Sequence, residues 1–192
     1  WNAFKKFVHA QTEELLSNYG KIDILWLDGG WVCKKNQQDI DMPRIASRAR
    51  ELQPGLIIVD RTIHGPYENY QLNFPWESCI PLSNDWGWVR HPAWKTSTKV
   101  INTLVEVVAK GGNLVLGVGP TAEGRIQPEA VSRLDSIGQW LQRYGQAIYN
   151  TVTTPYYNEG KLWFTVSKNG QQRYAVYALQ DHEPLPKTLS WQ

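Results

Sequence analysis

GKIDILWLDGGW occupies residues 20–31 and contains a short apolar run between glycine positions. Ile22 and residues 24–27 predict a buried β-strand, because strands that are covered on both faces are continuously apolar. Asp28 follows at the carboxyl end of this strand. Ligands bind at that end in barrels and in open parallel sheets alike, so Asp28 is a candidate functional carboxylate. The alternative is that Asp28 caps a loop or a helix through backbone N–H groups.

Helical periods and further apolar runs alternate along the chain around this strand. Apolar positions at helical spacing predict helices at residues 2–19, 43–52, 98–108 and 128–144, the third capped by Ser97. Two more short apolar runs predict strands at residues 56–59 and 114–118. The alternation of helices and strands is typical of a parallel α/β architecture. Residues 60–96 show no regular period, and an irregular segment of this length is usually functional.

The pattern changes after about residue 150. Short alternating runs predict antiparallel strands at residues 161–166, 173–179 and 188–191. A (β/α)8 barrel needs about 250 residues, so three parallel strands cannot close one. The predicted fold class is therefore α/β. We expect residues 1–150 to be the C-terminal portion of a (β/α)8-like barrel and residues 151–192 to begin an incomplete antiparallel β-sandwich. A doubly wound sheet is the competing architecture.

The first residues suggest how the chain relates to a larger protein. The chain has no initiator Met and is helical in pattern from residue 2. We therefore expect the interior of a longer polypeptide, whose N-terminal barrel half would be the partner of this one.

The composition excludes several classes of function. Twenty Lys and Arg against 18 Asp and Glu leave a net charge of +2, too balanced for an electrostatic nucleic-acid binder. No apolar run reaches the roughly 20 residues of a membrane span. The four histidines lack metal-ligand spacing, and the glycine-rich residues 111–124 lack the phosphate-binding motifs. We expect neither a cofactor nor a metal, and neither nucleic acid nor a membrane as partner.

Tryptophan is unusually frequent, and six of the ten lie between residues 26 and 94. A core prefers Leu, Ile and Val, whereas indoles near loops offer flat surfaces on which a ligand can stack. Trp26 shares a strand face with Asp28 by the period of two, as a ligand platform or as core packing. Trp86 and Trp88 either line a pocket or cover the core.

Charged side chains near the strand ends complete the candidate site. Glu77, in Phe-Pro-Trp-Glu, lies where a partly desolvated carboxyl suits a general acid. The alternative is an exposed loop glutamate, and Glu68 is the rival acid. Arg61 ends the second strand on the same edge as Asp28, where it holds a ligand or forms a structural ion pair. Cys33 and Cys79 lie in predicted loops, either as a disulfide or as two thiols.

Five motifs follow one another in a recognisable order. They are WLDGGW at residues 26–31, Asp60-Arg61, Pro75-Trp76-Glu77, Asp85-Trp86-Gly87-Trp88, and GGNLVLGVGPTAEG at residues 111–124. Each motif is weak alone, but the ordered set resembles glycoside hydrolase family 29, the α-L-fucosidases. The resemblance covers residues 1–150, and the tail resembles the start of that family's C-terminal β-sandwich.

The resemblance implies retaining hydrolysis of small molecules or glycans that carry a terminal α-L-fucose. Asp28 matches the family's nucleophile, and Glu77 matches the acid/base glutamate of its Trp-Glu motif. Trp26 matches a residue that lines the fucose pocket, and Arg61 one that contacts the site. The resemblance also implies a periplasmic or secreted protein, or a lysosomal one in a eukaryote.

Two other functions remain open at this point. One is a non-catalytic carbohydrate-binding protein on a hydrolase-like barrel, and the other is a retaining glycosidase for another hexose. Both Asp28 and Glu77 are present, which favours an enzyme over a binding protein. A panel of aryl glycosides separates the sugars.

Overall fold

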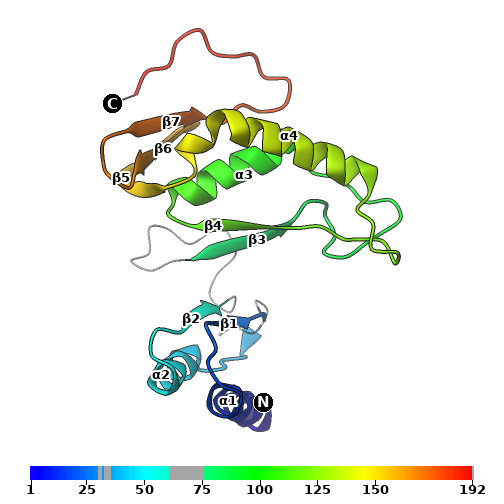
Figure 1. The fold of residues 1–192 in the computed structure, drawn as a ribbon, viewed down its shortest axis with the longest axis vertical. Coiled ribbons are helices and arrows are strands. Elements are labelled where there is room, and N and C mark those ends of the chain that lie inside the picture. Colours follow the sequence, from blue (N-terminus) through cyan, green and yellow to red (C-terminus); the bar gives the residue numbers. More distant parts are fainter. Residues whose placement is uncertain (30–31, 33–35, 61–75, 192) are drawn as a thin grey trace. The chain divides into compact units, whose positions relative to one another are not determined.

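The computed structural model describes residues 1–29, 32, 36–60 and 76–191. In chain order the elements are α1 (Asn2–Asn18), β1 (Ile24–Leu27), α2 (Met42–Leu52), β2 (Ile57–Asp60), β3 (Glu77–Pro81), α3 (Ser97–Ala109), β4 (Asn113–Gly117), α4 (Pro128–Tyr144), η2 (Gly145–Ala147), β5 (Thr151–Glu159), β6 (Leu162–Ser167) and β7 (Arg173–Tyr177) (Figure 1). The chain is mixed α/β, as the alternation predicts. It divides into two compact units, Trp1–Glu68 and Asn69–Gln192. No helix in the described part of the chain is both long and apolar enough to span a membrane.

The first unit packs two helices on one face of a parallel strand pair. β1 pairs with β2 in parallel, with Leu25 opposite Ile58. The core is formed by buried apolar side chains of both helices, of β1 and of the residue before β2; they are Leu16, Leu25, Ala49 and Leu56. Ile58 of β2 is partly buried against them. Because side chains alternate along a strand, the opposite face of the pair carries Ile24 and Ile57, and both are about half exposed. Among the described residues of this unit, helices therefore cover one face of the strand pair and not the other.

The second unit repeats this arrangement and adds an antiparallel sheet. β3 pairs with β4 in parallel, and α3 and α4 lie along the strand pair (Figure 1). The buried core between these elements consists of Leu82, Val100, Ala130 and Ile137. α3 begins at Ser97, and Thr96 caps it, because the Thr96 hydroxyl accepts the Lys99 amide at 3.1 Å. The prediction that Ser97 is the cap is thus wrong by one residue.

β3 corrects the prediction of an irregular segment over residues 60–96. β3 contains too few apolar residues for its local sequence to predict a strand; its sequence is Glu-Ser-Cys-Ile-Pro. Its strand conformation comes from the parallel ladder with β4. Register with a distant partner, rather than local propensity, therefore determines this element.

The antiparallel sheet also differs from the prediction. β5, β6 and β7 pair in that order, and β5 is a strand that the sequence did not predict. Its ladder shifts register between Thr153 and Asn158, around Pro155, which has no amide to donate. Residues 188–191, predicted as a strand, have no regular structure.

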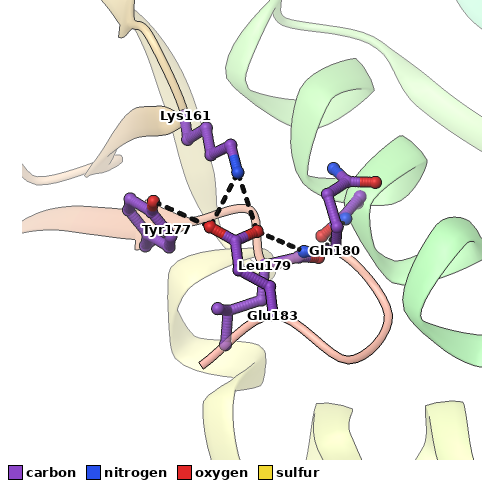
Figure 2. Close-up of polar contacts among 6 residues, drawn as sticks. Lys161, Tyr177, Leu179, Gln180 and Glu183 are labelled. Carbon is purple, nitrogen blue, oxygen red and sulfur yellow. Dashed lines mark hydrogen bonds and ion pairs between the residues drawn. The ribbon is translucent and has the colours of Figure 1, made fainter. Parts of the chain in front are cut away.

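The segment after β7 is tied to the sheet and to α3. Both oxygens of Glu183 accept hydrogen bonds from the Lys161 ammonium at 2.7 Å, and one also accepts the Gln180 amide at 2.9 Å (Figure 2). The Tyr177 hydroxyl donates to the same carboxylate at 3.2 Å. The Leu179 carbonyl accepts from the Asn102 side chain of α3 at 2.7 Å. These contacts, here called the Glu183 clamp, hold residues 179–183 in place.

Candidate active site

Asp28 follows directly after β1, at the carboxyl end of the strand pair in the first unit. Leu25 points into the helix-covered core, whereas Trp26 is 44% exposed and lies on the other face. Asp28, two residues beyond Trp26, is exposed. The strand thus presents an indole and then a carboxylate toward the edge at which parallel sheets bind ligands. This is the placement that the sequence predicts for Asp28.

The partner strand brings a second chain segment to the same edge. Leu27 is opposite Asp60 in the parallel register, so β1 and β2 end side by side. Arg61 comes next in the sequence. Arg61 and the rival acid Glu68 lie outside the described residues, so their contacts with Asp28 stay predictions.

Glu77 is the first residue of β3, at the amino end of the strand. It is half-buried and lies opposite Asn113 in the parallel register. The alternation along β3 places Glu77, Cys79 and Pro81 on one face and the buried Ser78 and Ile80 on the other. Glu77 is thus part of a strand, not of a loop as expected. Glu77 and Pro81 are four steps apart along the strand, which is about 13 Å at 3.3 Å per residue.

Trp76 holds the amino end of β3 against β4. Its indole is buried, and its carbonyl accepts the Asn113 amide at 3.0 Å. A Cβ on Gly112 would lie 2.6 Å from carbon atoms of the indole, so only glycine fits at that position. Trp76, the residue directly before Glu77, is therefore tightly packed, and this packing fixes the start of β3.

Trp86 and Trp88 lie in the loop that follows the carboxyl end of β3. They are 54% and 46% exposed, so both indoles are accessible to solvent. Of the two interpretations that the sequence left open, exposure favours a ligand surface over a core cover. Cys79 is half-buried on β3, and Cys33 lies outside the described residues.

Lys95 is a residue of this region that sequence reasoning did not single out. Its ammonium donates to the backbone carbonyls of Pro81, at 2.8 Å, and of Ser83. A single lysine in Ala-Trp-Lys-Thr carries no motif that distinguishes it from a surface lysine. Within the described residues, no cluster of His, Cys, Asp and Glu has the composition to hold a metal ion.

The fold and these residues define a class of protein: an α/β chain of parallel strand pairs whose strand ends carry a carboxylate and exposed indoles. Comparison with known proteins gives the family. Residues 1–146 match the model of the alpha-L-fucosidase family. The tissue alpha-L-fucosidase of Bos taurus is 31% identical over 209 residues, covering 95% of this chain and 43% of the bovine protein.

Solved structures agree. An alpha-L-fucosidase from Bacteroides thetaiotaomicron, trapped as a covalent intermediate with 2-fluoro-fucosyl fluoride, superposes with a TM-score of 0.62 at 25% identity. That match covers 88% of this chain and 46% of the bacterial one. The alpha-fucosidase of Thermotoga maritima in complex with fucose superposes with a TM-score of 0.60 at 29% identity, covering 87% of this chain and 41% of that one.

The chain belongs to the alpha-L-fucosidase family, glycoside hydrolase family 29. It spans less than half the length of these relatives. The resemblance carried by the five ordered motifs is thereby confirmed at the level of the family.

Proposed function

We propose that this chain is part of a retaining α-L-fucosidase, with Asp28 as its nucleophile. The observation that carries the proposal is the exposed Asp28 at the carboxyl end of a parallel strand, with the exposed indole of Trp26 on the same face. Membership of the alpha-L-fucosidase family supports the sugar. Fucose has a methyl group where other hexoses have a hydroxymethyl, so an apolar indole wall suits it.

The barrel is part of the same proposal. Residues 1–150 would form the C-terminal portion of a (β/α)8-like barrel. In support, each unit carries exposed apolar residues on its own strand pair: Ile24 and Ile57 in the first unit, and Val115 of β4 in the second. The remaining strands would come from the rest of the same polypeptide, because a closed barrel needs about 250 residues. Residues 151–192 would begin the β-sandwich.

The proposed mechanism has two steps and needs no cofactor. The Asp28 carboxylate attacks the anomeric carbon and forms an ester bond, while the bond to the leaving oxygen breaks and a second carboxyl group donates its proton to that oxygen. The second group, now a carboxylate, takes a proton from water, and the hydroxide oxygen displaces Asp28 and releases fucose. The bacterial relative trapped as a covalent intermediate supports this route.

Glu77 is the proposed acid/base group because it stands in the Trp-Glu motif, with Glu68 as the rival. Its place at the amino end of β3 bears on this choice, since catalytic residues of barrels come from the carboxyl ends of the strands. The role of the acid is therefore tested by substituting Glu77 and Glu68 separately. The substrate would be a small molecule or glycan with a terminal fucose, and the protein would act in the periplasm, outside the cell or in a lysosome.

The test is a panel of aryl glycosides on the full-length protein, with Asp28→Gly and the control Asp23→Asn. Asp23 is an exposed carboxylate just before β1 and is paired with Lys21, so its replacement by asparagine should leave turnover unchanged. We expect hydrolysis of the α-L-fucoside alone, and a loss of at least about 10³-fold in Asp28→Gly.

Each other outcome has its own meaning. Normal turnover in Asp28→Gly ends the assignment of the nucleophile. Preferred hydrolysis of another glycoside favours the hexosidase alternative. Fucose binding without hydrolysis of any member of the panel favours the carbohydrate-binding protein.

A further inference from the structure

The loop of residues 82–95 carries Trp86 and Trp88 and begins where β3 ends. Its two stems run antiparallel and are joined by backbone contacts: a bridge between Ser83 and Trp94, and hydrogen bonds from the Asn84 amide to the Ala93 carbonyl (3.0 Å) and from the Lys95 amide to the Leu82 carbonyl (3.0 Å). The Leu82 amide donates to the Gly117 carbonyl of β4 at 2.8 Å. The base of the loop thus continues the sheet.

Lys95 closes this base with its side chain as well. The ammonium donates to the carbonyls of Pro81 (2.8 Å) and Ser83, which flank Leu82 in the first stem. Leu82 is 1% exposed in the core of the second unit. Burial lowers the pKa of Lys95 below its usual range, and the nearby charge of Lys99 adds to this shift. A desolvated cation is costly unless polar groups surround it, and here the backbone carbonyls of Pro81 at the end of β3 and of Ser83 in the loop supply that compensation.

α4 and the turn after β4 hold the loop from other sides. Arg133 of α4 donates to the Lys95 carbonyl at 2.8 Å, and its guanidinium lies 5.6 Å from the centre of the Trp94 ring. A Cβ on Gly119 would come within 2.5 Å of the backbone at Gly87 and Trp88. The tip of the loop therefore rests on the backbone at Gly119, and the whole loop is held at its base and at its tip.

We propose that Lys95 is a positioning residue. Its ammonium fixes the base of the loop and thereby holds the indoles of Trp86 and Trp88 in position to contact a substrate at the carboxyl ends of the strands. Both indoles are about half exposed and lie beyond the carboxyl ends of β3 and β4, where parallel sheets bind ligands. A loop ordered in advance avoids the entropic cost of ordering it around each substrate. That the indoles contact a fucoside rests on the proposed function; the anchoring of the loop does not.

The activity test is a double-mutant cycle on the full-length protein with an aryl fucoside. We expect Lys95→Met to lower kcat/KM by about 10- to 100-fold, mainly through KM. In a Trp86→Ala/Trp88→Ala background the same change should have little further effect, because the groups that Lys95 positions are gone. Lys99→Met removes an exposed lysine nearby and should leave kcat/KM unchanged. Equal losses from Lys95→Met in both backgrounds would overturn the proposal.

Hydrogen exchange tests the anchoring without any catalysis. In Lys95→Met, amides of residues 82–95 should exchange faster, whereas α3 and α4 keep their protection. Gly119→Ala displaces the tip of the loop while Lys95 stays intact, and it should also speed the exchange of the loop amides. It replaces Lys95→Met in this test if Lys95→Met does not fold. Its control is Gly138→Ala in α4, where a Cβ meets nothing within 4 Å. Unchanged exchange of the loop in Lys95→Met contradicts the proposal even if the protein hydrolyses no fucoside.

Discussion

The two carboxylates of the proposed mechanism occupy opposite ends of their strands. Asp28 follows the carboxyl end of β1 and is exposed, whereas Glu77 begins β3 and is half-buried. A nucleophile needs an accessible carboxylate, and the exposure of Asp28 meets this requirement. A general acid must reach the leaving oxygen, so the position of a carboxyl group counts before its environment when the acid is assigned. Because Glu77 lies at the amino end of its strand, single substitutions must decide whether Glu77 or Glu68 is the acid.

We expect Glu77→Ala to lower the turnover of substrates with poor leaving groups by about 10²–10⁴-fold. Substrates with good leaving groups should lose less, because they depart without a proton. Added azide should restore activity and yield fucosyl azide with the configuration of the substrate, since azide attacks the covalent intermediate. Kinetics with both leaving groups are the measurement, and Glu68→Ala is the matched variant. Unchanged kinetics in Glu77→Ala, with this pattern in Glu68→Ala, would transfer the role to Glu68.

At the scale of the elements, segments without regular structure are held by side chains. The 82–95 loop depends on Lys95, and residues 179–183 depend on the Glu183 clamp (Figure 2). Lys161 lowers the pKa of Glu183 chiefly by its hydrogen bond, and the same contact raises the pKa of Lys161. The carboxylate therefore stabilises the clamp above the ordinary pKa of a glutamate, and this contribution is lost as the pH falls through the lowered value. The contribution of Lys161 is lost only when the pH rises through its raised pKa.

This linkage predicts that Glu183 titrates in the acid range, below the ordinary pKa of a glutamate. The NMR signal of the Gln180 amide, which donates to Glu183, should shift over that range with a midpoint below that of an ordinary glutamate. In Lys161→Met the midpoint should rise toward the ordinary value, because the strongest stabiliser of the carboxylate is removed. Lys168→Met, on an exposed lysine after β6, is the control. An identical midpoint in Lys161→Met and the wild type would show that the clamp does not couple the two charges.

At the scale of the whole molecule, the residues of the proposed mechanism are distributed over the two compact units. Asp28 belongs to Trp1–Glu68, and Glu77, Trp86 and Trp88 belong to Asn69–Gln192. Retention of configuration requires two carboxyl groups about 5–5.5 Å apart, and inversion requires about 6.5–9.5 Å. The stereochemical outcome therefore reports the spacing of the two catalytic carboxyl groups in the full-length protein.

We expect the first product of the full-length protein to be α-L-fucose, formed from an α-L-fucoside with its configuration kept. Proton NMR of the anomeric signal during the first minutes of hydrolysis distinguishes α from β before mutarotation mixes them. The nonenzymatic hydrolysis of the same substrate is the control. An initial β product would mean that a water molecule, and not Asp28, attacks the anomeric carbon.

Local sequence was sufficient where one element is amphipathic over several turns or continuously apolar. The four helices and the strands β1, β2 and β4 follow from such patterns, with ends that differ by one or two residues. The position of Asp28 at a strand end was predictable for the same reason. A short apolar run followed by Asp-Gly-Gly is enough to predict where the strand ends and the carboxylate follows. The order of five motifs along the chain was enough to indicate the family.

Tertiary structure decided what depends on partners distant in sequence. β3 is a strand because β4 pairs with it, and β5 is a strand in spite of Pro155 because β6 supplies its ladder. The same holds for Lys95, whose role arises from carbonyls that only the folded loop brings to its ammonium. Periodicity records which face of an element is buried, but pairing, hydrogen bonds to backbone carbonyls and close backbone approaches at Gly112 and Gly119 arise only when the chain is folded.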